Sequence, residues 1–186
     1  PHRLCVDPHF PGGGPQKDGE DPHFPYGKEQ IYPGNNLDYH LRPFEAAFEA
    51  HTAQIMPYYG VPVGLEYEEV GFGYNKAIIT DLLRGRYGFD GVVCTDYGLV
   101  HDKQIMGGTL LATAWGVEHL SVPDRVKTII DAGCDMLGGE TCPEMIVQLV
   151  EGGQIGEPSG IVEVGGNDLL DDIHPLGWSE EGRFSR

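Results

Sequence analysis

The chain has 186 residues, a formal net charge of -17 and 40% hydrophobic residues, which is the composition of a globular protein with one core of ordinary size. Binding to phosphate backbones or anionic lipid requires a basic surface, so this acidic balance argues against nucleic acid and against a membrane as partners. No apolar run approaches the roughly 20 residues of a membrane-spanning helix. The composition therefore fits a globular protein that acts on neutral ligands, although an acidic surface is usually only a solubility feature.

The four cysteines, Cys5, Cys94, Cys134 and Cys142, show no CxxC or Cys/His spacing. We expect buried thiols rather than a disulfide framework or a zinc site. Because the first residue is Pro1 rather than a methionine, we expect the native start, and any targeting signal, to lie upstream.

Short apolar runs alternate with helical patterns along the chain. Strands are expected where the opening segment reaches residues 9–14 and at the runs 53–60, 92–94 and 132–140. Helices are expected at residues 41–51, 75–87, 122–132 and 143–152, the third of them with Ser121 as its N-cap. This alternation, with no hairpin signature, predicts an α/β fold with a parallel sheet.

Two segments depart from this pattern. Residues 9–33 form a long loop rich in Gly, Pro, Asp and His, and a loop of this length in a compact domain is usually functional or disordered. Residues 157–186 have scattered glycines and acids and no sustained period, so we expect an irregular or disordered acidic tail after a domain at residues 1–156.

Asp96 lies two residues after the apolar run Val92–Val93–Cys94, where we expect the strand to leave the core. A carboxylate is disfavoured inside a buried parallel strand but is common at its carboxyl end, where α/β proteins place their chemistry. The same spacing is also typical of an aspartate that caps the next helix or turn. From the residues alone, both interpretations remain open.

Four motifs occur in order: HFPGGGP at residues 9–15, GEDPHFPYG at 19–27, IMPYYG at 55–60 and GFDGVVCTDYG at 88–98. Together they resemble glycoside hydrolase family 3, in particular its bacterial β-glucosidase branch, over roughly residues 8–156. The family fold is a (β/α)8 barrel followed by an α/β sandwich domain.

A closed barrel needs at least about 200 residues. The resemblance therefore implies a partial (β/α)8 TIM-type barrel of about four βα units, the second half of the catalytic domain. Half a barrel leaves two open sheet edges and an uncovered inner face. We expect a fragment of a longer enzyme, or a chain that closes by pairing as a homo-oligomer or with a complementing half-barrel, and marginal stability of the lone monomer.

The resemblance also implies site residues and a reaction. Asp96 matches the nucleophile of retaining hydrolysis, His9 and Tyr59 match substrate-binding residues beside it, and Tyr97 takes the place of an aromatic that flanks the sugar. The implied partner is a carbohydrate, a glucoside or short oligosaccharide that loses its terminal β-linked glucose, and no metal or organic cofactor is needed. Pro8 replaces the usual lysine before His9, and Tyr97 replaces the usual tryptophan.

Two alternatives stay open, because the family's acid/base glutamate belongs to the sandwich domain. A related branch, the β-N-acetylglucosaminidases, carries an Asp-x-His acid/base dyad in the loop after HFPG, and Asp21 and His23 have that spacing. The other alternative is a catalytically inert fragment that binds sugar weakly.

Some residues receive a structural interpretation. We expect Glu140 to cap the helix near Pro143, with a sugar contact as the alternative, and Trp115 to pack on the loop after Asp96. His101, like the histidines that lack ligand spacing, is expected to lie in solvent or at the rim.

Overall fold

The structure is a computed structural model that describes residues 6–105 and 108–156. Its strands are β1 (Val6–Phe10), β2 (Glu29–Ile31), β3 (Gln54–Pro57), β4 (Val61–Val63), β5 (Val92–Val93), β6 (Lys103–Ile105) and β7 (Gly108–Leu110). Its α-helices are α1 (Leu37–Glu49), α2 (Val122–Ala132) and α3 (Pro143–Glu151). The π-helix η5 (Ala77–Arg86) and the 3-10 turns η1 (Lys17–Gly19), η2 (Pro25–Gly27), η3 (Pro33–Asn35) and η4 (Phe72–Tyr74) complete the list.

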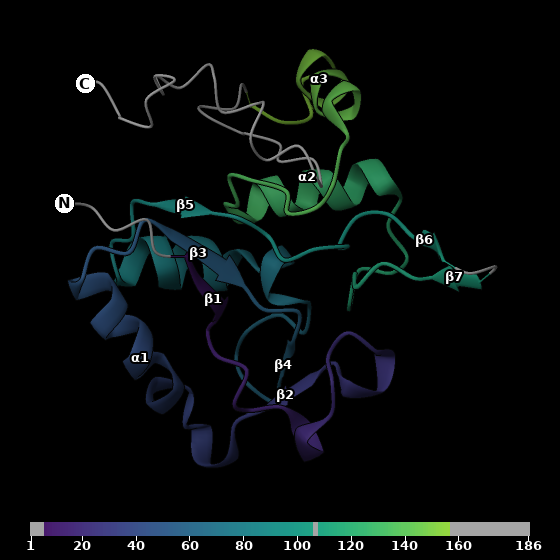
Figure 1. The fold of residues 1–186 in the computed structure, drawn as a ribbon. Coiled ribbons are helices and arrows are strands. Elements are labelled where there is room, and N and C mark those ends of the chain that lie inside the picture. The colour runs from purple at the N-terminus through teal and green to yellow at the C-terminus, as the bar shows by residue number, and fades with distance from the viewer. Residues whose placement is uncertain (1–5, 106–107, 157–186) are drawn as a thin grey trace, which may run out of the picture.

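A parallel sheet in the order β1, β3, β5 lies at the centre of the molecule (Figure 1). Along the chain, α1 lies between β1 and β3, and η5 lies between β3 and β5. After α2 the chain returns beside β5, where a parallel bridge joins Cys94 to Met136. The alternation of strand and helix thus gives the parallel pairing that the sequence predicts.

The helix predictions agree closely with the structure because their signals are local. The predicted helix 122–132 is α2, and Ser121 caps it by accepting a hydrogen bond at 3.3 Å from the backbone N–H of Asp124. The helix predicted at 41–51 begins earlier, at Leu37, because Leu37 and Leu41 bury the same face as Phe44. The helical spacing of apolar residues therefore predicted α1, η5 and α2, the helices that follow the strands of the sheet.

Although the sequence shows no hairpin signature, β6 and β7 pair antiparallel, with Lys103 opposite Leu110. Each of these strands has only three residues, too few for an alternating pattern to stand out.

The predicted strand at 132–140 is reduced to the single bridge at Met136. Within the long loop 9–33, β2 pairs in parallel with β4, so that loop contains ordered structure. The predicted tail 157–186 and Cys5 lie outside the described residues.

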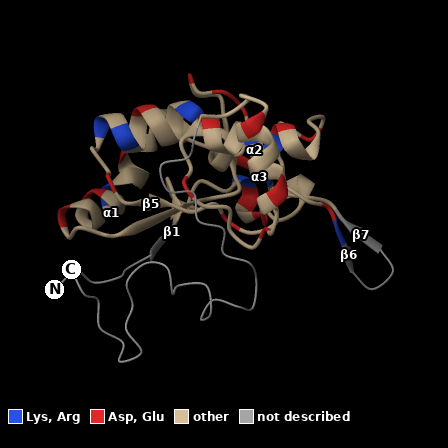
Figure 2. Ribbon diagram, turned by 90° about the horizontal axis from the view of Figure 1, so that it is seen from above, with Lys and Arg blue, Asp and Glu red and all other residues tan. Residues whose placement is uncertain are grey.

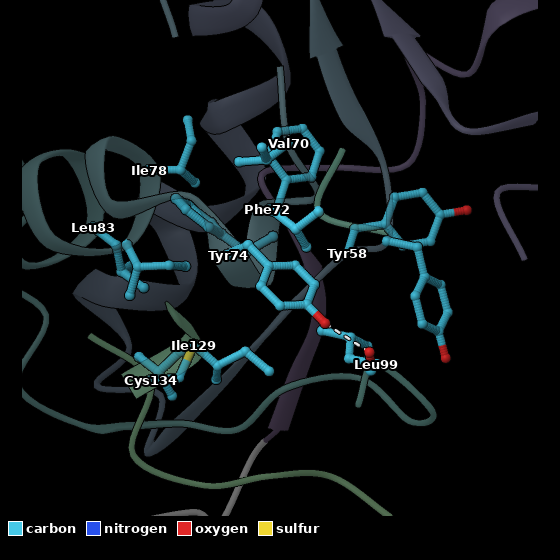
Figure 3. Close-up of a cluster of buried hydrophobic side chains, with 14 of the residues drawn as sticks. Tyr58, Val70, Phe72, Tyr74, Ile78, Leu83, Leu99, Ile129 and Cys134 are labelled. Atoms are coloured by element: carbon cyan, nitrogen blue, oxygen red, sulfur yellow. Dashed lines mark hydrogen bonds between the residues drawn. The ribbon is translucent and has the colours of Figure 1, made fainter. Parts of the chain in front are cut away.

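Apolar side chains from η4, η5 and α2 meet beside the sheet and form much of the core (Figure 3). The labelled members include Phe72, Tyr74, Ile78, Leu83, Ile129 and Leu99. The hydroxyl of Tyr74 donates a hydrogen bond to the carbonyl of Leu99 at 2.6 Å, drawn as a dashed line. This bond ties the core to the segment that follows Asp96.

Acidic residues occur along each of the helices α1, α2 and α3, where they are red on the ribbon (Figure 2). They reflect the excess of 29 Asp and Glu over 12 Lys and Arg in the sequence. Among the helices of the described segments, none combines the length and apolar character that a membrane crossing requires.

Candidate active site

Asp96 lies at the carboxyl edge of the parallel sheet, directly beyond β5. The backbone N–H of Thr95 donates to the carbonyl of Met136 at 2.9 Å, which continues the pairing of Cys94 with Met136 up to the residue before Asp96. Asp96 is only 7% exposed. A carboxylate so deeply buried needs hydrogen-bond donors, and its surroundings supply them on one side.

One carboxylate oxygen of Asp96, Oδ1, receives two donors. The backbone N–H of Tyr97 lies 2.8 Å from it and the hydroxyl of Tyr59 lies 2.9 Å from it. The Tyr59 hydroxyl also lies 2.7 Å from the carbonyl of Tyr97, so its single proton is shared between two acceptors. Burial, and then the nearby charge of Asp96, raise the pKa of Tyr59 well above its ordinary value, which keeps the phenol protonated and able to donate.

The other oxygen of Asp96, Oδ2, is buried and has no hydrogen-bond partner among the described residues. Nε2 of His9 lies 3.6 Å from this oxygen. The two oxygens are therefore different: one is fixed by donors, and the other has its lone pairs available.

His9 reaches Asp96 because the edge strand is irregular at this point. The register of β1 against β3 shifts between Pro8 and Phe10, and His9 takes a left-handed backbone conformation with φ of 70°. Bulges of this kind often redirect a side chain beside an active site. The ring of His9 lies 4.7 Å from that of Tyr58, which helps to hold it over the sheet edge.

Asp21 and His23 form the pair that their spacing suggests. Nδ1 of His23 lies 2.6 Å from Oδ1 of Asp21, and the backbone N–H of His23 donates to the same oxygen at 3.0 Å. These two bonds, the backbone one first, lower the pKa of Asp21. The ring of His23 also packs on that of Tyr59 at 4.6 Å between centroids, which brings the pair beside the Asp96 site.

A cavity of about 540 Å³ adjoins this site. Asp21, His23, Tyr59 and Tyr97 line it, so four of the six residues singled out from the sequence share one cavity. Asp96 and His9 are not among its lining residues. His9 lines a separate cavity of about 650 Å³, between the glycine loop 12–14 and α1.

Glu140 does not cap α3, so that prediction is wrong. The N-cap of α3 is Cys142, and the carboxylate of Glu140 points instead to the loop after Asp96. There it accepts a bond from the backbone N–H of Val100 at 3.0 Å and lies 2.8 Å from Nδ1 of His101. His101 itself lines the 540 Å³ cavity, a position that the sequence interpretation missed.

Trp115 is buried in the core cluster that also contains Leu99 and Val100 of the loop after Asp96, and it contacts a second loop as well. Its indole Nε1 donates to the carbonyl of Pro22 at 2.7 Å, so it anchors the loop that carries Asp21 and His23.

The described cysteines Cys94 and Cys134 are buried thiols, as the sequence predicts, and burial raises the pKa of both. Within residues 6–105 and 108–156, no cluster of three or more His, Cys, Asp or Glu side chains is arranged to hold a metal ion.

The fold and the site define an α/β protein with a buried carboxylate at the carboxyl edge of a parallel sheet and an aromatic, polar cavity beside it. Comparison with known families shows to which family of such proteins the chain belongs. The chain belongs to glycoside hydrolase family 3, because the model described as the glycosyl hydrolase family 3 N terminal domain matches residues 4–160.

Curated relatives and solved structures agree with this family. The chain is 59% identical over 152 residues to a protein named Beta-glucosidase C from Emericella nidulans, which covers 82% of this chain and 25% of the relative. It is 40% identical over 170 residues to a Periplasmic beta-glucosidase/beta-xylosidase from Dickeya chrysanthemi, with 83% and 26% covered. A solved family 3 beta-N-acetylglucosaminidase from Paenibacillus superposes with a TM-score of 0.62 at 26% identity, over 82% of this chain and 27% of that chain.

The relatives named β-glucosidase are thus fungal as well as bacterial, and the resemblance is not limited to a bacterial branch. The chain spans about a quarter of the length of these curated relatives.

Proposed function

We propose that this chain carries the nucleophile of a retaining, β-glucosidase-like glycosidase. The observation that carries the proposal is the asymmetry of Asp96, whose Oδ1 is held by two donors while Oδ2 is left without a hydrogen bond. Relatives named β-glucosidase at 59% and 40% identity support the substrate class, a β-linked glucoside or short oligosaccharide.

In this proposal Oδ2 of Asp96 attacks the anomeric carbon of the sugar. A bond forms between Oδ2 and that carbon, the glycosidic bond breaks, and the leaving oxygen departs with its electron pair and takes up a proton. Water then cleaves the covalent glycosyl-enzyme and restores the carboxylate. Tyr59 steadies Oδ1, His9 binds a sugar hydroxyl, and Tyr97 offers its half-exposed ring to the sugar's C–H face.

The proposal is tested with a 2,4-dinitrophenyl β-glucoside, whose good leaving group needs no acid catalyst. We expect slow release of dinitrophenol by the chain and loss of that release in Asp96→Asn. Asp131→Asn, which changes an exposed aspartate on α2, is the matched control and should keep the activity. Equal rates in the Asp96 variant and the native chain would contradict the proposal.

A second candidate, β-N-acetylglucosaminidase activity, is favoured by the contact of 2.6 Å between Asp21 and His23. A carboxylate-paired histidine is a sound proton shuttle. Hydrolysis of an aryl N-acetylglucosaminide that is lost in His23→Ala would support it. Thermal protection by glucose without turnover of either substrate would instead favour an inert sugar-binding fragment.

We also propose that β1, β3, β5 and the segment at Met136 are four consecutive strands of a (β/α)8 barrel, its second half, within a domain that ends near residue 156. The parallel order β1, β3, β5 and the bridge from Cys94 to Met136 support this, as do the intervening helices. A complete barrel would then need further strands, from a longer chain, a second copy or a complementing half-barrel, beside the outer edges at β1 and Met136.

A further inference from the structure

The loop after Asp96 is held firmly by groups from separate parts of the fold. Tyr74 of η4 donates to the carbonyl of Leu99 at 2.6 Å, and Arg125 of α2 donates through Nη1 to the carbonyl of Val100 at 3.0 Å. Glu140 accepts the N–H of Val100 at 3.0 Å. With its backbone groups bound on several sides, the loop places the next residue, His101, at a defined position.

Glu140 also fixes the ring of His101. Its carboxylate is 4% exposed; Oε1 accepts the backbone N–H of His101 at 3.4 Å, and Oε2 lies 2.8 Å from the ring Nδ1. A carboxylate oxygen only accepts, so Nδ1 is the donor in this contact. The other ring nitrogen, Nε2, is left for a ligand, as in sites where a buried carboxylate sets the orientation and tautomer of a functional histidine.

The cavity that His101 lines has the chemistry of a carbohydrate site. Its volume of about 540 Å³ lies within the range of small-molecule pockets. Tyr59 and Phe24 contribute aromatic surface for the C–H face of a sugar, while His23 and His101 contribute hydrogen-bonding groups for its hydroxyls.

This cavity is separate from the attacking side of Asp96. Oδ2 of Asp96 faces His9 at 3.6 Å, and neither residue lines the cavity. The sugar ring under attack therefore belongs beside Oδ2 and His9. The cavity, which borders Asp96 through Tyr59 and Tyr97, is left for the group on the other side of the glycosidic bond.

We propose that His101, oriented by Glu140, binds the leaving group of the substrate, a second sugar or an aryl alcohol, in this cavity. The proposal rests on the proposed function above, since it concerns a second subsite of the same reaction. In the orientation described, Nε2 of His101 forms a hydrogen bond with a hydroxyl of that leaving group. Glu140 is a positioning residue, because it acts only through His101.

The binding of two sugars distinguishes the two subsites. Glucose is expected to fill only the site beside Asp96, whereas methyl 4-thio-β-cellobioside, a disaccharide that is not hydrolysed, should fill both. By calorimetry we expect His101→Ala to weaken disaccharide binding about tenfold, the equivalent of one hydrogen bond, and to leave glucose binding within about twofold. His119→Ala, an exposed histidine outside the cavity, is the matched control and should change neither affinity.

Nuclear magnetic resonance of the unmodified chain tests the same contact without relying on a variant that must fold. The His101 ring signal should shift on addition of the disaccharide and remain in place with glucose. In Glu140→Gln, which offers one acceptor oxygen instead of two, the ring ¹⁵N signals should lose the Nδ1–H tautomer signature. Disaccharide binding should then weaken severalfold while glucose binding is kept.

Disaccharide affinity that is unchanged in a folded His101→Ala variant, or a His101 signal that does not respond to the disaccharide, would overturn the proposal. In both cases, reaction at Asp96 with an activated glucoside would leave the proposed function intact. Equal losses of affinity for glucose and for the disaccharide in His101→Ala would also overturn the proposed role of His101, because His101 would then support the whole site. No binding of either sugar by the native chain would overturn this proposal, and no reaction at Asp96 would overturn the proposed function.

Discussion

At the scale of single residues, the Tyr59 side chain connects Asp96 with the Asp21 and His23 pair. Its hydroxyl donates to Oδ1 of Asp96 at 2.9 Å, and its ring packs on that of His23. Removal of this hydroxyl in Tyr59→Phe leaves Oδ1 with the Tyr97 N–H as its donor. A hydrogen bond to a charged group contributes about 1.5–3 kcal/mol, so we expect dinitrophenyl glucoside turnover to fall roughly 10- to 100-fold.

Tyr58→Phe is the matched control for this change. Its hydroxyl accepts from Nε2 of Gln16 at 2.9 Å and makes no hydrogen bond to Asp96. Turnover in Tyr58→Phe should stay within about threefold of the native chain. Equal losses in the two variants would mean that the Tyr59 hydroxyl has no special role at the carboxylate.

Cys94, two residues before Asp96, links stability to pH. Burial, and then the charge of Asp96, raise the pKa of its thiol from 9.0 to about 11. Between these values only the unfolded chain releases the proton, so the free energy of unfolding should fall as pH rises from 9 to 11, by about 2 kcal/mol. Urea unfolding measured at several pH values should show a smaller fall in Cys94→Ala. An identical pH dependence in the two chains would contradict this.

The position of Asp96, two residues after an apolar run, marked it as a candidate from local sequence, although a cap was an equally good interpretation; its proposed role came from the family resemblance. The run itself is only partly buried, since Val92 is 38% exposed. His101 could not be found from local sequence, since its partner Glu140 lies 39 residues further along the chain. Only the return of the chain beside β5 brings the two together. The Asp21 and His23 pair was found because both partners fall within three residues.

At the scale of elements, the turn at Gly138 packs against the strand end that carries Asp96. A Cβ on Gly138 would lie 2.1 Å from the carbonyl oxygen of Thr95, a backbone atom that cannot move without displacing Asp96. Gly138→Ala should therefore cost about 1–3 kcal/mol of stability and lower the turnover as well. Gly156→Ala, whose Cβ would meet nothing within 4 Å, should change stability by less than about 0.5 kcal/mol.

Urea unfolding and dinitrophenyl glucoside assays on both variants check this. Native stability and turnover in Gly138→Ala would show that the turn does not constrain the site.

Helices were easier to predict than strands for a physical reason. The apolar spacing of α1 and the Ser121 cap of α2 are properties of consecutive residues. The β6–β7 pair and the bridge at Met136 depend instead on what lies beside them, and strands of one to three residues carry too little pattern. The strand predicted at 132–140 failed for this reason.

At the scale of the whole molecule, the sheet has open edges. In the described structure β1 pairs with β3 and not with a strand on its other side, and an open parallel edge favours association. We therefore expect sedimentation velocity to detect species larger than the monomer at micromolar concentration, with a larger share at higher concentration. A monomer at all concentrations, with a sharp cooperative melt, would contradict the proposed half-barrel pairing.

If Asp96 is the nucleophile of a retaining glycosidase, as we propose, a slowly hydrolysed sugar should remain bound to it. The most direct measurement is mass spectrometry of the intact chain after incubation with 2,4-dinitrophenyl 2-deoxy-2-fluoro-β-glucoside, followed by peptide mapping. The account predicts one fluoroglucosyl adduct, on Asp96, and no adduct in Asp96→Asn. An adduct on another residue, or a folded chain that takes up no adduct, would contradict it.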